Sequence, residues 1–322
     1  GASTTTCALS TFIHLFMPNT SNSPQEKTPA PAIRAYLGGS FDPVHNGHLE
    51  VAMSVYQHLL PIATQLQRTL HVSLLPNARS PFKTQSTDPN HRLNMLKLAT
   101  ENTPIQINEL ELWQAPPVYT IDSVRMLRQQ YPNDSLIFIM GMDSAHSSDK
   151  WRDGLCLTDY VNLWVLNRES SDDINDKISD STTSFKNPIA ASQYLATLQS
   201  QLPLPLQPHV TDSSIELLTP IAQHVVDSLE TNSLDLKSAV KGRIYIDTRP
   251  ITAVSSTQIR EQLQILANKT NKMPVTDRQI ASIAPINDIM SNTHPNSLAK
   301  WLNPAVYHYI IAHQLYSAAQ FR

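Results

Sequence analysis

Two histidines lie three residues apart in the glycine-rich segment GGSFDPVHNGHL, residues 38–49. The chain holds seven glycines in 322 residues, and three of them fall in this segment, so the backbone here must turn tightly or approach something closely. A helix that begins near Asn46 would present free N–H groups and its positive dipole end. His45 and His48 could then both donate hydrogen bonds to one phosphate.

The histidine pair also fits two roles that involve no phosphate. A glycine-rich turn with two surface histidines has the same sequence, so the motif alone does not decide. A zinc site of the helical metalloprotease kind needs histidines four residues apart with a glutamate between them, whereas Asn46 and Gly47 stand between these two. The spacing therefore argues against zinc, and we predict no protein-held metal.

A second cluster lies in VSSTQIREQL, residues 254–263. Ser255 and Gln258 have the spacing of a capping box, so a capped helix and nothing more is one interpretation. The same helix start would also be an anion site with hydroxyl groups and a guanidinium, from Ser255, Ser256, Thr257 and Arg260. Two anion sites on one sheet suggest a polyphosphate held between them.

Further candidates follow other predicted elements. Gly141 and Asp143 stand just past an apolar strand, where a carboxylate can accept from ribose hydroxyls, although an ordinary turn fits equally well. Tyr119 and Trp151 could stack on a heterocycle or simply pack. Lys83 is either a phosphate contact or a solvated surface lysine.

The elements that must position these residues alternate between strand and helix. Hydrophobic patterning predicts strands at 33–37, 70–76, 105–112, 135–141, 160–166 and 243–247, and helices at 49–60, 91–99, 120–130, 255–266 and 304–316. Such alternation predicts an α/β fold with a Rossmann-like, doubly wound parallel sheet, whose ligands bind beyond the carboxyl ends of the strands.

Composition shifts divide the chain. Residues 1–31 are expected to be a disordered tail or a processing remnant, and the status of the residues before Met17 stays open. Residues 32–322 are predicted to form one domain with polar insertions at about 169–240 and 268–297, the first with a modest helical stretch at 189–199.

Bulk properties exclude several classes of protein. Apolar residues make up 41% of the chain and charged residues 16%, with no run of the roughly 20 apolar residues that a membrane span needs. The net charge of −3 argues against a nucleic-acid-binding surface. Cys7 and Cys156 support no disulfide framework, and no cation precedes Lys27 as a signal peptide would require. We expect a cytoplasmic protein.

Four motifs in order resemble bacterial nicotinate-nucleotide adenylyltransferases, within the HxGH nucleotidyltransferase superfamily. They are GGSFDPVHNGHL (38–49), ELELWQAPPVYTIDSV (109–124), FIMGMDSAHSSDKW (138–151) and SSTQIRE (255–261). The resemblance covers about 33–168 and 243–264, with a weaker match at 302–316.

The resemblance implies that the 5′-phosphate of nicotinate mononucleotide attacks the α-phosphorus of ATP, with Mg²⁺ present and no covalent enzyme intermediate. The implied catalytic residues are His45, His48 and Arg260. ATP would be bound by these three and by Gly39, Ser40, Phe41, Gly141, Asp143, Ser255, Ser256 and Thr257. The acceptor nucleotide would be bound by Lys83, Tyr119, Thr120 and Trp151.

Some points stay open at this stage. The family often has a histidine before the basic residue where this chain has SPFK (80–83), so only Lys83 carries over. The insertions could be disordered, mediate homo-oligomer contacts or cover the site. The acceptor could instead be nicotinamide mononucleotide or another phosphate, and a nucleotide-binding sensor without turnover is the non-enzymatic alternative.

Overall fold

The computed structural model describes residues 27–79, 86–167, 188–219, 223–227, 234–238, 240–249, 251, 254–272 and 297–316. Some of the predictions concern residues outside these ranges. They are the tail up to residue 26, Lys83, the polar stretch 168–187 and the interruption at 273–296.

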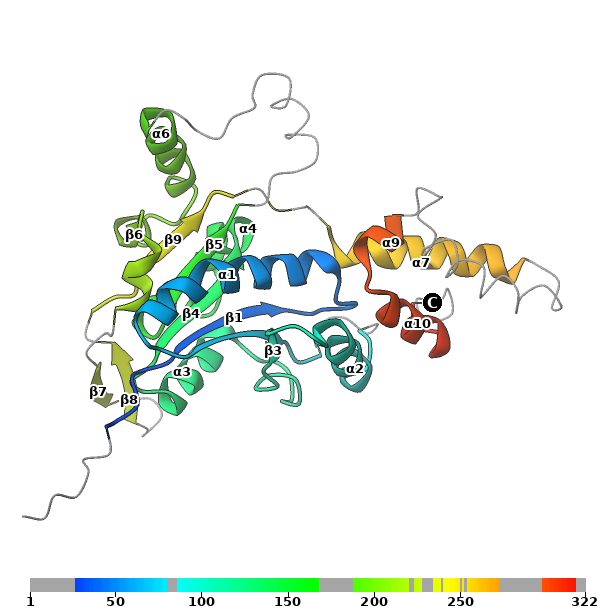
Figure 1. The fold of residues 1–322 in the computed structure, drawn as a ribbon, viewed down its shortest axis with the longest axis horizontal. Helices are drawn as coiled ribbons and strands as arrows, with labels where there is room; N and C mark the ends of the chain where they lie inside the picture. Colours follow the sequence, from blue (N-terminus) through cyan, green and yellow to red (C-terminus); the bar gives the residue numbers. More distant parts are fainter. Residues whose placement is uncertain are drawn as a thin grey trace, which may run out of the picture.

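Seven strands form one parallel sheet in the order β3-β2-β1-β4-β5-β9-β6 (Figure 1). Their bounds are β1 Ile33–Gly39, β2 Leu70–Pro76, β3 Gln106–Ile107, β4 Ser135–Gly141, β5 Asn162–Leu166, β6 Val210–Thr211 and β9 Ile244–Asp247. β7 (Gln223–Asp227) and β8 (Leu234–Ser238) make a separate antiparallel pair. The strands step outward from β1 to β3 on one side and through β4 to β5 on the other, and β9 then lies between β5 and the edge strand β6. This arrangement confirms the doubly wound α/β fold.

Helices cover both faces of the sheet because strand side chains alternate between the faces. Ala35 and Leu37 of β1 join an apolar cluster with α1 (Asn46–Gln65) and α2 (Pro89–Thr100). Tyr36, between them, joins a second cluster with α3 (Thr120–Gln130) and α4 (Met142–His146). Each fully buried leucine or isoleucine in these clusters contributes roughly 1.5–3 kcal/mol.

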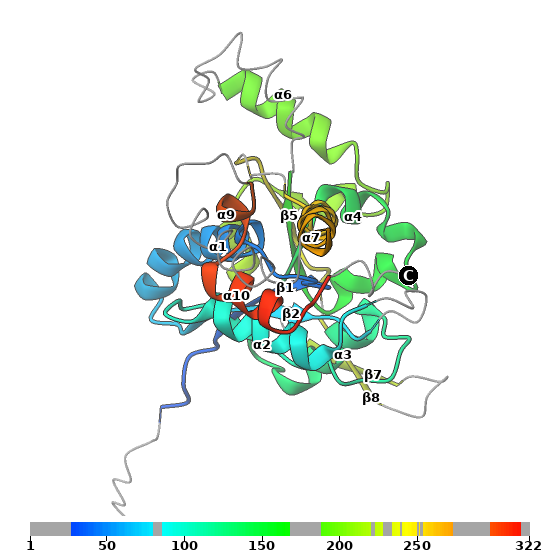
Figure 2. The same cartoon turned by 90° about the vertical axis from the view of Figure 1, so that its right-hand side faces the viewer.

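The carboxyl end of β1 faces a group of helices from the last part of the chain. α7 (Ser256–Asn271), α9 (Ser297–Trp301) and α10 (Pro304–Ala312) lie together beyond that end of the sheet, as Figure 2 shows from that side. Ile259, Leu298 and Val306, one from each helix, are buried in the same cluster as α1. The first and last thirds of the chain therefore build one end of the molecule.

One predicted strand was largely wrong. The segment 105–112 forms only the two-residue β3, because the Asn108 side chain accepts a hydrogen bond from the Leu110 N–H at 2.9 Å and turns the chain. A further bond from the Trp113 indole N–H to Glu109 fixes the turn that follows. The alternating apolar residues after Ile107 therefore lie in a turn and not in a strand.

Other element ends differ by a few residues. The closing helix stops at Ala312 instead of residue 316, since Gln314 and Tyr316 have left-handed backbone angles. α7 continues to Asn271, past the start predicted for the second polar interruption. Strands 70–76 and 135–141 and helix 120–130 are confirmed at both ends.

The segment predicted as the first insertion contains ordered elements. α6 (Pro188–Gln199) forms where the helical stretch was predicted, β6 extends the main sheet, and a 3₁₀ helix at Ser214–Leu218 buries two leucines in the core. The division into one domain with two insertions stays a prediction. Among the helices of the described residues, none is long and apolar enough to cross a membrane.

Candidate active site

The loop between β1 and α1 carries the predicted glycines. Gly38 and Gly39 end β1, where added Cβ atoms would lie 3.0 Å from the Phe138 ring and 3.2 Å from the Phe41 ring. None of the glycines in the described part of the chain has a positive φ, whereas Phe41 has φ 47°. These two glycines thus allow close ring packing, and the sharp bend falls on a phenylalanine.

His45 and His48 form one stacked pair at the start of α1. Their ring centroids are 3.6 Å apart with an interplanar angle of 22°, and His45 is buried. The His45 backbone N–H donates to Nδ1 of His48 at 3.1 Å. Because Nδ1 accepts, His48 carries its proton on Nε2, which is therefore a donor. The two rings therefore lie together at the helix start, and their shared role toward a phosphate stays a prediction.

Gly47 lies between the two histidines and directly against one of them. A Cβ on Gly47 would approach Cε1 and Nδ1 of His45 to 3.0 Å and Cβ of Val254 to 3.6 Å. Only a residue without a side chain fits there without displacing the ring. The position of Val254 also shows that the residues just before α7 lie close to the start of α1.

The start of α7 is tied to the loop before α1. Ser255 and Gln258 form the predicted capping box, with the Gln258 N–H donating to Ser255 Oγ at 3.1 Å. Ser256 Oγ donates to the Pro43 carbonyl at 3.0 Å, and Arg260 Nη1 donates to the Asp42 carbonyl at 2.7 Å. The two predicted anion sites are therefore neighbours, joined through residues 42–43.

Sequence reasoning missed Arg92 of α2, which holds the loop between β1 and α1. Its guanidinium is 1% exposed and donates to the Ser40 carbonyl and the Asn77 carbonyl, each at 2.9 Å. A buried arginine needs hydrogen-bond partners. Nη1 and Nη2 of Arg92 have them, whereas its buried Nε has none among the described residues. The signal was present in the sequence, since Arg92 shares a helical face with the apolar Leu96 and Ala99.

Sequence reasoning also missed the surroundings of Asp42. This buried carboxylate accepts from the Thr87 N–H at 3.2 Å and from the Tyr316 hydroxyl. No sequence pattern joins Asp42 to a residue so near the other end of the chain. The loop is therefore held by the Arg92 side chain of α2, by the Thr87 backbone N–H in the segment before α2, and by the Tyr316 side chain after α10.

The remaining predicted residues lie at other strand and helix ends. Gly141 caps α4, and Asp143 is exposed in the first turn of α4, just past β4. Tyr119 caps α3, and Thr120 is its first residue. The Arg152 guanidinium, next to Trp151, lies 4.8 Å from the centroid of the Tyr119 ring. Tyr119 and Trp151 both pack against the second apolar cluster.

Glu111 is a buried carboxyl group in the segment before α3. Burial raises its pKa, and a hydrogen bond with Ser123 opposes this in part. When the folded-state pKa is raised, burial adds little cost below the unfolded pKa, and the full cost appears as pH rises through the folded pKa. We therefore expect Glu111→Gln to raise the melting temperature more at about pH 8 than at about pH 4. An equal change at both pH values would contradict this.

Comparison with known proteins identifies the family. Residues 36–262 match the model of the cytidylyltransferase-like family. The chain is 30% identical to the probable nicotinate-nucleotide adenylyltransferase of Idiomarina loihiensis, covering 72% of this chain and 88% of that protein. It is 32% identical to that of Pseudoalteromonas atlantica, covering 69% and 95%. The chain belongs to the nicotinate-nucleotide adenylyltransferase family.

A third relative adds local detail within this family. The nicotinate-nucleotide adenylyltransferase of Bacillus subtilis is 41% identical over 119 residues, covering 36% of this chain and 58% of that protein. The family match at 36–262 includes both the histidine pair and Arg260. α9 and α10 lie beyond it. The family resemblance drawn from the four motifs is thus confirmed, and the chain is a nucleotidyltransferase.

Proposed function

We propose that the chain transfers the adenylyl group of ATP to nicotinate mononucleotide. The acceptor's phosphate oxygen forms a bond to the α-phosphorus of ATP, the bond from that phosphorus to the bridging oxygen breaks, and pyrophosphate leaves. The product is nicotinate adenine dinucleotide. One observation carries this proposal. The start of α1, with its histidine pair, and the start of α7, with Arg260, lie side by side because α7 donates hydrogen bonds to the carbonyls of residues 42–43.

The phosphate end is assigned to these two helix starts. His45 and His48 donate to the α-phosphate as negative charge builds on its oxygens, with Nε2–H of His48 already set by the bond at its Nδ1. Arg260 and residues 255–257 hold the rest of the triphosphate with the free N–H groups of α7. Gly39, Ser40 and Phe41 line the same loop. Catalysis is then mainly positioning and charge stabilisation.

The acceptor end is assigned to the neighbourhood of Tyr119. Backbone N–H groups at Tyr119 and Thr120 would donate to the nicotinate carboxylate at the start of α3, while Trp151 stacks on the pyridine ring. Asp143, exposed just past β4, would bind the ATP ribose beside its Gly141 cap. Lys83 would contact a phosphate.

Enzymes of this family use ATP, which normally binds a divalent ion. We propose that this ion is Mg²⁺ and that it is part of the ATP substrate. Within the described ranges, no three His, Cys, Asp or Glu side chains gather as metal ligands. We propose that the ion arrives with the triphosphate of ATP, as part of that substrate. Its role there is to neutralise phosphate charge.

The decisive experiment is an acceptor comparison. Purified protein is incubated with ATP and Mg²⁺ and with either nicotinate mononucleotide or nicotinamide mononucleotide, and pyrophosphate and dinucleotide are measured. We expect a strong preference for the acid, because the start of α3 favours a negative group. Equal rates would widen the function to both acceptors. No product from either, with ATP still bound, would favour another acceptor or a nucleotide sensor.

A further inference from the structure

The chain turns back toward the active-site loop after α10. Gln314 and Tyr316 have φ angles of 51° and 58°, which non-glycine residues adopt rarely and which reverse the direction of the chain. This turn buries the Tyr316 side chain to 1% exposure, in the apolar cluster shared with α1. A large polar side chain so deeply buried needs a partner for its hydroxyl group.

That partner is Asp42, in the loop that leads to the histidine pair. The Tyr316 hydroxyl donates to Oδ1 of Asp42, and the Thr87 N–H donates to Oδ2 at 3.2 Å. The Asp42 carboxylate is itself buried, so it depends on these two donors. Its backbone carbonyl, in turn, accepts from Arg260 at 2.7 Å. One residue thus links the end of α10 to the guanidinium of the ATP site.

The hydroxyl of Tyr316 stays protonated under ordinary conditions. Burial, and then the charge of Asp42, raise the pKa of Tyr316 well above its usual value. The side chain therefore remains a hydrogen-bond donor throughout the neutral range. The hydrogen bond from Tyr316 to Asp42 should therefore not change with pH in the neutral range.

We propose that Tyr316 is a positioning residue for the ATP site, because its hydroxyl fixes the Asp42 carboxylate and thereby holds residues 42–45 against Arg260. The substrate names rest on the function proposed above. Tyr316 lies outside residues 36–262, the part of the chain that the family model matches. It touches no reacting atom, and it acts through the loop.

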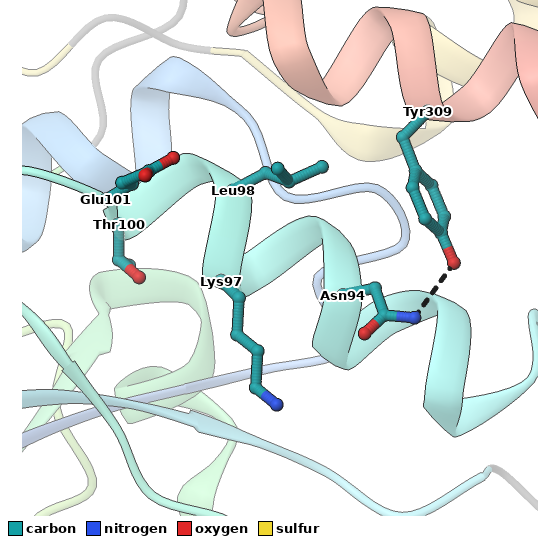
Figure 3. A pocket seen from close by; sticks show the side chains of 6 residues that line it. All are labelled: Asn94, Lys97, Leu98, Thr100, Glu101 and Tyr309. Atoms are coloured by element: carbon teal, nitrogen blue, oxygen red, sulfur yellow. Dashed lines mark hydrogen bonds between the residues drawn. The ribbon is translucent and has the colours of Figure 1, made fainter.

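The chain offers a matched control seven residues earlier, on α10 itself. The Tyr309 hydroxyl of α10 accepts from the Asn94 side chain at 3.1 Å and lies 2.7 Å from Nδ1 of His91. Figure 3 shows Tyr309 pointing at Asn94 on α2, in a pocket lined also by Lys97 and Glu101. Tyr309→Phe therefore removes a hydroxyl that ties α10 to α2, and none of its hydrogen bonds reaches the loop at 40–45.

The test compares Tyr316→Phe with Tyr309→Phe in the full chain. Since small displacements of catalytic groups cost up to about a hundredfold in rate, we expect Tyr316→Phe to lower kcat by about tenfold and to raise KM for ATP. KM for nicotinate mononucleotide should not change, because that nucleotide binds around Tyr119. Tyr309→Phe should change none of the three. Equal losses in both variants, or a loss that follows melting temperature alone, would overturn the proposal.

A binding measurement separates this proposal from the proposed function. Calorimetric titration with ATP and Mg²⁺, without an acceptor, should show weaker binding for Tyr316→Phe than for Tyr309→Phe even if neither mononucleotide is a substrate. Equal ATP affinity and normal kcat in a folded Tyr316→Phe would overturn the positioning role.

A double-mutant cycle provides the second test. If Tyr316 acts through Asp42, adding Tyr316→Phe to Asp42→Ala should cause no further loss of kcat. Should Tyr316→Phe fail to fold, Asp42→Ala alone must show the same substrate-selective losses. Losses that multiply in the double variant would show that Tyr316 acts by another route and would overturn the proposal.

Discussion

Replacing His45 by alanine is expected to lower kcat by about a hundredfold or more while the chain stays folded, the scale typical of a preorganised donor to developing charge. The ring is buried and stacked on His48, so it is already in place before the substrate arrives. The backbone N–H of residue 45 still donates to Nδ1 of His48 in the variant, which keeps the second histidine oriented. Pyrophosphate release gives kcat, and thermal melting reports the fold.

Asn46→Ala is the control for this prediction. Asn46 follows His45 directly, but its side chain donates to the Lys300 carbonyl on α9 at 2.9 Å, so it serves the packing of α9 on α1. Its loss should leave kcat near normal. Near-normal turnover in a folded His45→Ala would remove His45 from the catalytic set, whereas an equal loss in both variants would point to general disturbance of the helix start.

The sequence predicted most of the scaffold because the scaffold depends on local patterns. β4, Ser135–Gly141, is buried at every position, and its sequence is nearly all apolar. α3 has the helical spacing of buried residues that its sequence predicts. The capping box at Ser255 is likewise local. Hydrophobic period and capping chemistry act over a few residues, so a single sequence suffices to locate them.

Contacts between distant segments were beyond sequence reasoning. The bond from Tyr316 to Asp42 joins residues 274 positions apart, and Arg92 serves carbonyls on two other loops. Nothing in the order of residues specifies such partners, because they depend on how helices pack at the end of the sheet. Even the local prediction at 105–112 failed where one side-chain hydrogen bond, at Asn108, outweighed an apolar alternation.

Replacing Gly47 by alanine should separate activity from stability. Alanine in a helix is favoured over glycine by roughly 1 kcal/mol, so the variant should melt no lower than the natural chain if the site can adjust. The added methyl group, however, would lie 3.0 Å from the His45 ring, which must then move by a few tenths of an ångström or more. Since misplaced catalytic groups can cost up to about a hundredfold, we expect kcat to fall by about tenfold or more.

The cause of that loss can be isolated by combining the two variants. If Gly47→Ala acts by displacing the His45 ring, the substitution should cost little further activity in a His45→Ala background, where no ring remains to be displaced. If it acts instead by moving Val254 and the start of α7, the two losses should multiply, although the added methyl group would lie at an ordinary contact distance of 3.6 Å from Cβ of Val254. Measured kcat values for the two single variants and the double variant therefore decide whether the glycine between the histidines serves the ring or the neighbouring helix.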